Sequence, residues 1–263
     1  MSRSLSSISH RFARPVVAVG AGSFAVVLVL ALTGRGIYLD DPFIYYRYAQ
    51  HLGSGQGWAY NLGQPGTDHA FTSPLYVLLL AVGHLPGFSV PSVGTGIFVL
   101  ALSGAAVLTF VALRNVGHVR AGVIAAVLVS TSPLILQTRG METSLFLCAL
   151  AAALAAHVQG RAVLAGLALG VLALVRPEGI LLAVVLAATL VRRPAAIRAM
   201  ATTAAAVVIP WALYAQLALG HVLPSTLSAK MAQGASGLTG NNVFVQSLAS
   251  LPRSVAPWWL PAA

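Results

Sequence analysis

Two adjacent aspartates, Asp40 and Asp41, stand in a chain of 263 residues that contains only five acidic residues. A proline and a tyrosine-rich stretch that includes Tyr45 follow them. A carboxylate can take the proton of an attacking hydroxyl group, so the pair has the chemistry of a general base. Asp41 before Pro42 is also typical of a helix N-cap, and Gly53 of the end of that helix. The local sequence leaves both interpretations open.

Cationic side chains that could bind an anion are few outside the arginine-rich gaps between apolar segments. Guanidinium and ammonium groups suit phosphate oxygens, and the candidate phosphate-binding residues are Arg176, Lys230 and Arg139. Arg176 stands two residues before Glu178, so a structural ion pair explains it equally well. Lys230 also fits an anchor at a membrane interface. His69, next to Asp68, is a candidate to hold the headgroup of a substrate.

Glu178, Glu142 and Tyr45 complete the set of candidate substrate-binding residues. Glu142 begins an apolar run, where an acid also favours the helix dipole, so a structural role stays open beside the functional one. A divalent cation at Asp40 and Asp41 would suit carboxylate ligands. Two acids alone make a poor cage, so the sequence assigns no metal and no other cofactor.

The composition predicts an integral membrane protein. The chain is 58% hydrophobic and 8% charged, about a third of the charged share of a soluble domain. Its mean hydropathy is +0.86. The net charge of +10 does not indicate nucleic-acid binding, because most arginines lie in short gaps between apolar runs, as in the cytoplasmic loops of membrane proteins. We therefore expect membrane lipids as partners and no nucleic acid.

The apolar runs predict an all-α polytopic fold with about seven transmembrane helices. The expected spans are 15–33, 92–113, 121–137, 143–158, 162–175, 179–191 and 199–219. The run at 73–87 has about a dozen residues between its prolines, too few at about 1.5 Å per residue to cross a hydrocarbon core of about 30 Å. We expect it to lie at the outer interface, with other juxtamembrane helices in the first outer loop.

With the N-terminus in the cytoplasm, this threading places all five acids on the extracytoplasmic side and most arginines inside. The predicted domains are a cytoplasmic tail at 1–14, a membrane core at 15–219 and an extracytoplasmic segment at 220–263. The first extracytoplasmic loop is 34–72, and the interfacial helix at 73–87 follows it.

Several ordered motifs resemble those of a known enzyme family. They are "DDPFIYYRYAQHLGSGQGWAYNLGQP", "TSPLYVLLLA", "GMETSLF", "RPEGILL" and "LPSTLSAK", and they cover about 38–230. Together they resemble the polyprenyl-phosphate-dependent glycosyltransferases of the C superfamily, in particular the actinobacterial arabinofuranosyltransferase-like members. Such enzymes have a membrane core of about seven helices and a catalytic aspartate in the first outer loop.

The resemblance implies transfer of a sugar, arabinofuranose or mannose, from a polyprenyl-phosphate donor to a cell-envelope glycan, lipid or protein acceptor. It implies that one aspartate of the pair is the base, and Asp41 is favoured over Asp40. Members of the family usually continue into further helices and a carbohydrate-binding domain, whereas this chain stops at "SVAPWWLPAA". The C-terminal part of the enzyme is therefore expected to be missing.

Two other functions compete with the glycosyltransferase. A transporter or lipid flippase also keeps charges within broken helices, but it would show inverted repeats and acids near the bilayer midplane. The sequence shows no internal repeat, and its acids gather on one face. An inactive, truncated remnant of a glycosyltransferase is the other alternative.

Overall fold

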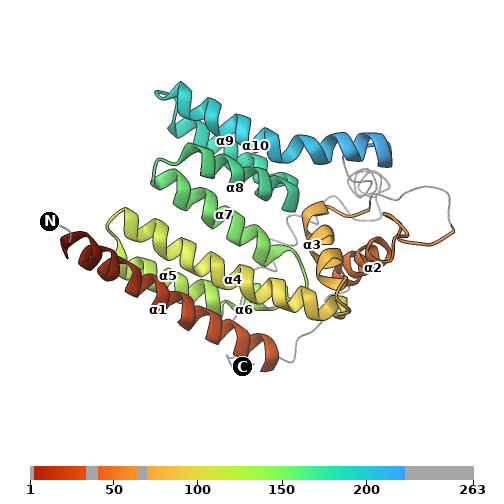
Figure 1. Ribbon diagram of the computed structural model, residues 1–263, viewed down its shortest axis with the longest axis horizontal. Helices are drawn as coiled ribbons and strands as arrows, with labels where there is room; N and C mark the ends of the chain where they lie inside the picture. The colour runs from red at the N-terminus through yellow and green to blue at the C-terminus, as the bar shows by residue number, and fades with distance from the viewer. Residues whose placement is uncertain (1–2, 34–40, 64–69, 223–263) are drawn as a thin grey trace, which may run out of the picture.

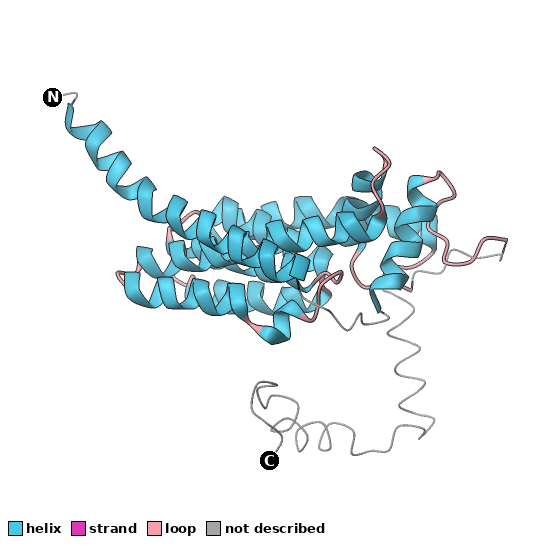
Figure 2. Ribbon diagram, turned by 90° about the horizontal axis from the view of Figure 1, so that it is seen from below, coloured by secondary structure: helices cyan, strands magenta, loops and turns pink. Residues whose placement is uncertain are grey.

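The computed structural model describes residues 3–33, 41–63 and 70–222, and all regular elements within these ranges are helices (Figures 1 and 2). The all-α class predicted from the sequence is therefore confirmed for this part of the chain. Three of the candidate site residues, Asp40, His69 and Lys230, lie outside the described residues.

Four helical stretches are long and apolar enough to cross a membrane. They are Arg14–Thr33 within α1 (Arg3–Thr33), all of α4 (Val90–Asn115), α5 (Val119–Thr131) continued by α6 (Pro133–Leu136), and α10 (Pro194–Tyr214) continued by the π-helical turn η2 (Ala215–Leu219). The four correspond to predicted spans. Their composition and length support a membrane protein.

The predicted count of about seven spans is not confirmed, because three of the predicted spans form shorter helices. They are α7 (Thr143–Val158), α8 (Ala162–Val175) and α9 (Ile180–Thr189), the last preceded by the 3₁₀ turn η1 (Pro177–Gly179). The longest of them, α7, has 16 residues, which at the α-helical rise is about 24 Å against about 30 Å of hydrocarbon. Membrane crossing by these three helices stays a prediction.

The helices form one bundle in a simple order (Figure 1). α4 packs against α1 and α5 on one side and against α7 on the other, α8 packs against α7, and α10 covers α8. Because consecutive helices run in opposite directions, the turns at 137–142 and 176–179 come to the same end of the bundle as α2 (Asp41–Gly53) and α3 (Pro74–His84). The turns at 116–118, 159–161 and 190–193 lie at the other end, with Arg114, Arg120, Arg161, Arg192 and Arg193 in or beside them.

Small residues let α8 and α10 approach closely. A Cβ atom added at Gly170 would lie 2.6 Å from the Cβ of Val207 and 2.9 Å from the carbonyl oxygen of Ala204. One turn earlier, Gly166 faces the backbone of Met200, and the Thr203 hydroxyl donates across the interface to the Val163 carbonyl at 3.2 Å. In a lipid environment the hydrophobic effect does not drive helices together, and close packing at small residues contributes to their association instead.

α2 and α3 form a small aromatic module at the end of the bundle. The predicted helix at 42–52 and the predicted short helix within 73–87 are both present, whereas the interfacial position of the second stays a prediction. Trp58 is buried, stacks on Phe71 with ring centroids 5.0 Å apart, and donates to the Tyr214 hydroxyl at 2.9 Å. Arg47 donates to the Tyr60 carbonyl at 2.6 Å, which holds the segment after α2 against that helix. These hydrogen bonds and ring contacts hold the module together and attach it to α10.

The close packing of α8 on α10 yields a prediction. Gly170→Ala inserts a methyl group where neighbouring atoms leave no room, and overpacking of this kind typically costs about 1–3 kcal/mol. Gly96→Ala is the matched control, since a Cβ at this exposed helical position meets nothing within 4 Å. Thermal unfolding of the purified protein in detergent should show a lower Tm for Gly170→Ala and an equal or higher Tm for Gly96→Ala. Equal behaviour of the two variants would contradict the packing.

Candidate functional site

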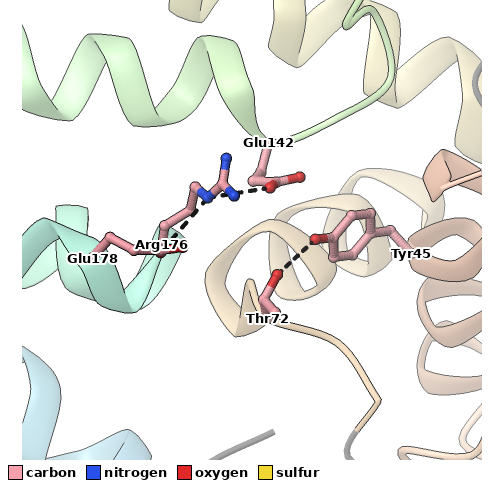
Figure 3. Close-up of polar contacts among 5 residues, drawn as sticks. All are labelled: Tyr45, Thr72, Glu142, Arg176 and Glu178. Atoms are coloured by element: carbon pink, nitrogen blue, oxygen red, sulfur yellow. Dashed lines mark hydrogen bonds and ion pairs between the residues drawn. The ribbon is translucent and has the colours of Figure 1, made fainter. Parts of the chain in front are cut away.

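Four of the residues selected from the sequence come together where the acidic turns meet α2 (Figure 3). Glu142 is the last residue before α7, Arg176 ends α8, Glu178 lies in η1 and Tyr45 extends from α2. Segments separated by about a hundred residues thus contribute to one cluster. These four residues and Thr72 form the polar cluster.

The turn that carries Glu142 is held by tyrosines of α2 and α3. Gly140 has a φ of +92°, a left-handed conformation that favours glycine. Its carbonyl accepts a hydrogen bond from the buried Tyr76 hydroxyl at 2.7 Å, and the Tyr46 hydroxyl occupies the place where a Cβ would stand. A glycine and two tyrosines therefore fix the start of α7 and, with it, the position of Glu142.

Arg176 leaves the helical path because a proline follows it. Its φ of −152° and ψ of 130° are extended, as expected for a residue before proline, and Pro177 begins the 3₁₀ turn. The Arg176 amide still donates to the Leu172 carbonyl at 2.9 Å, so the residue is anchored at the end of α8. This geometry turns the side chain toward α7 instead of along α8.

Arg176 lies between one buried and one exposed carboxylate (Figure 3). Its Nε atom is 3.8 Å from Oε1 of Glu142 and 3.7 Å from Oε2 of Glu178. The side chain of Glu142 is 3% exposed and that of Glu178 62%, while that of Arg176 is 40% exposed. The ion pair with Glu178 indicated by the sequence is present, and a second pair with Glu142 accompanies it. Both separations exceed ordinary hydrogen-bond length, so the guanidinium group is held loosely.

Burial raises the pKa of Glu142 above its ordinary value of 4.5. Its own backbone amide, Arg176 and the nearby Tyr45 hydroxyl oppose this rise, and the negative charge of Asp41 adds to it. The Oε2 atom of Glu142 has no hydrogen-bond partner within the described part of the chain, and the same holds for the buried hydroxyls of Ser73 and Ser144. A carboxylate with an unsatisfied oxygen in such a place is costly unless a ligand, a water molecule or a proton meets it.

Tyr45 and Thr72 form the side of the cluster nearest α2 and α3. Their hydroxyl oxygens lie 3.0 Å apart in a hydrogen bond (Figure 3). Burial and the charge of Glu142 raise the pKa of Tyr45, so its hydroxyl stays protonated at neutral pH. Two hydroxyl groups beside a carboxyl group and a guanidinium group can bind the oxygens of an anion or of a polyol.

The other selected residues take different positions. Asp41 is exposed in the first turn of α2, near enough to Glu142 for their charges to interact. Arg139 donates a hydrogen bond to the Ala31 carbonyl at the end of α1 and thus connects the turn before α7 to that helix. Within the described ranges, no group of three metal-ligating side chains occurs. Tyr45, Glu142 and Arg176 therefore lie together, and Asp41 lies near Glu142.

An apolar groove of about 490 Å³ lies at the same end of the bundle as the polar cluster. Its walls come from α2 and the segment after it, from α3, α8 and α10; the lining residues are Leu52, Trp58, Leu78, Leu174, Val207, Pro210, Trp211 and Tyr214. Leu174, which lines the groove, precedes Arg176 by two residues along the chain. The carboxyl end of α8 therefore contributes one residue to the groove and another to the polar cluster.

Sequence reasoning missed Thr72, Ser73 and Ser144. The first two precede Pro74, and Ser73 stands at the N-cap of α3, but its hydroxyl makes no capping hydrogen bond. Ser144 follows Glu142 by two residues in the turn-to-helix segment. The sequence shows that these residues lie near a helix start, but a serine in such a position usually caps the helix. Only the burial of the two serine hydroxyls without a hydrogen-bond partner separates them from ordinary capping residues.

Comparisons with protein-family models, with curated proteins and with solved structures found no match for this chain.

The burial of Glu142 predicts a pH-dependent stability. A raised pKa in the folded state gives stability that is present below the ordinary value of 4.5 and is lost as pH rises through the folded pKa. Glu142→Gln removes the charge and should raise Tm at pH 7–8 by a few degrees, about 1–2 kcal/mol, with a smaller gain near pH 4.5.

The exposed Glu178→Gln is the matched control, since it also removes one carboxylate from Arg176 and should change stability by less than about 0.5 kcal/mol. Thermal unfolding of both variants between pH 4 and 8 makes the comparison. A lower Tm for Glu142→Gln at every pH would show that the ion pair with Arg176 outweighs the burial of the charge.

Proposed function

We propose that this protein is a membrane glycosyltransferase that transfers a sugar, such as arabinofuranose or mannose, from a polyprenyl-phosphate donor to a cell-envelope acceptor with inversion. The observation that supports it most is that a cationic group, Arg176 at the end of α8, and an apolar groove lie at the same end of the bundle. A lipid-linked phosphate has these two parts, a charged headgroup and a hydrocarbon chain. The ordered motifs from residue 38 to 230 point to the same donor.

In the proposed reaction, the acceptor hydroxyl attacks the anomeric carbon and the bond from that carbon to the phosphate oxygen breaks. Asp41 takes the proton of the attacking hydroxyl, and the departing phosphate keeps the electron pair of the broken bond. Arg176 faces the growing negative charge of the phosphate, which a cation stabilises most in the transition state. Lys230 is a second candidate for this role.

The remaining residues of the cluster would bind the sugar. Tyr45 and Thr72 present hydroxyl groups, and Glu142 presents an unpartnered carboxyl oxygen, which suits the hydroxyls of a sugar. Asp40 and His69 adjoin this region in the sequence and complete the proposed loop. Glu178 holds Arg176 from the solvent side.

Labelled polyprenyl-phosphate sugars, incubated with membranes that contain the protein and with cell-envelope glycan acceptors, test the activity directly. Appearance of label in the acceptor, with loss of the sugar from the lipid, supports the transferase. Movement of intact donor between the leaflets of vesicles without transfer would favour a flippase. Neither event, with every donor and acceptor offered, would favour an inactive protein.

The aspartate pair gives the sharpest prediction for activity. Asp41→Asn keeps side-chain size and helix capping, because asparagine caps a helix about as well as aspartate does. If Asp41 is the base, transfer should fall by about a hundred- to ten-thousandfold. Asp40→Asn serves as the comparison, and initial rates of sugar transfer by equally expressed variants identify the residue with the larger loss. Wild-type rates for both variants would refute the catalytic role of this loop.

The proposed topology places the N-terminus in the cytoplasm and the polar cluster outside. Exposed Gln56 lies at the end of the bundle with α2, and exposed Val116 lies in a turn at the opposite end. In a Cys148→Ser background, Gln56→Cys should react with a membrane-impermeant maleimide in intact cells. Val116→Cys should react only after the cells are opened. The reverse pattern would invert the topology.

A further inference from the structure

Arg176 has a charge environment that opposes the binding of an anion. Glu142 and Glu178 both lie within 4 Å of its Nε atom, so with both acids ionised the trio has a net charge of −1. An anionic headgroup at Arg176 would meet two carboxylates. The exposed Glu178 can turn toward solvent, but Glu142 lies in the interior and cannot.

We propose that an anionic lipid binds at Arg176 together with one proton, which Glu142 takes up. This inference rests on the proposed donor site and specifies how that site accepts its charge. When the headgroup pairs with the guanidinium group of Arg176, the buried carboxylate of Glu142 loses its cationic partner. An unpaired buried carboxylate is neutralised more readily than it is moved into water.

Protonation also changes what Glu142 offers to the ligand. An ionised carboxyl group only accepts hydrogen bonds, whereas a protonated one donates through its O–H. The Oε2 atom of Glu142 has no partner among the described residues, so a donated hydrogen bond to an anion oxygen would satisfy it. The start of α7, where Glu142 makes no capping bond, adds the partial positive charge of a helix N-terminus.

The neighbouring groups are consistent with Glu142 as the residue that titrates. From α2, Asp41 adds negative charge and raises the pKa of Glu142, and the Tyr45 hydroxyl lies beside it. From α3, Tyr76 also senses the charge of Glu142, and burial raises its pKa as it does that of Tyr45. Both tyrosines therefore stay neutral at physiological pH. Arg176 opposes protonation of Glu142, and binding of an anion removes that opposition.

Methyl farnesyl phosphate is a suitable probe, because this phosphodiester keeps a single negative charge from pH 5 to 9 and carries an apolar chain. Its binding to the full-length protein is measured by calorimetry across that range in two buffers that differ in heat of ionisation. We expect affinity to fall with rising pH by up to about tenfold per unit where Glu142 titrates. Up to one proton should be taken up per lipid bound.

Variants separate this inference from the proposed function. Glu142→Gln should bind the probe without proton uptake and with an affinity that no longer varies with pH. Arg176→Gln should lose most of the affinity. Arg176-dependent binding with no proton uptake in the wild-type protein would overturn the inference and leave the donor site intact. Absence of binding, or binding unaffected by Arg176→Gln, would overturn both.

Discussion

The pairing of Glu142 with Arg176 is the interaction on which the candidate site depends. A carboxylate inside an apolar helical bundle needs a cation close to it, and Arg176 supplies one from the end of α8. The cation can reach it because Pro177 ends the helix and turns the side chain toward α7. The two helices therefore meet through a charge pair at one end and through apolar contacts along their length.

That charge pair is looser than a structural ion pair needs to be. Both carboxylates lie beyond hydrogen-bond distance from Arg176, and one oxygen of Glu142 has no partner in the described part of the chain. A residue kept only for stability would be satisfied more fully or replaced by an apolar side chain, which is often no less stable. Incomplete satisfaction of a buried charged group is more typical of a binding site.

The sequence predicted the parts of the fold that follow from hydrophobic runs and their boundaries. Asp41 with Pro42 predicted the start of α2, and the prolines around 73–87 predicted the short helix α3; both agree with the structure. The number of membrane crossings was harder to predict, because α7 and α8 are apolar but shorter than the helices that are long enough to cross a membrane by themselves. Short helices can cross only where neighbouring protein surrounds them, which is a tertiary property.

The same limit applies to the site. Charge type and order along the chain selected Glu142 and Arg176, but their pairing depends on how α7 packs against α8, and the hydrogen bond of Thr72 to Tyr45 depends on how α3 sits beside α2. Arg139 illustrates the converse: like Arg176 it precedes an acidic residue in a turn at this end of the bundle, but its side chain contacts the end of α1. Two arginines in similar turns thus have different surroundings because different helices flank them. Arg176 is the one of the two that faces a buried acid, and the proposed donor site is therefore centred on it.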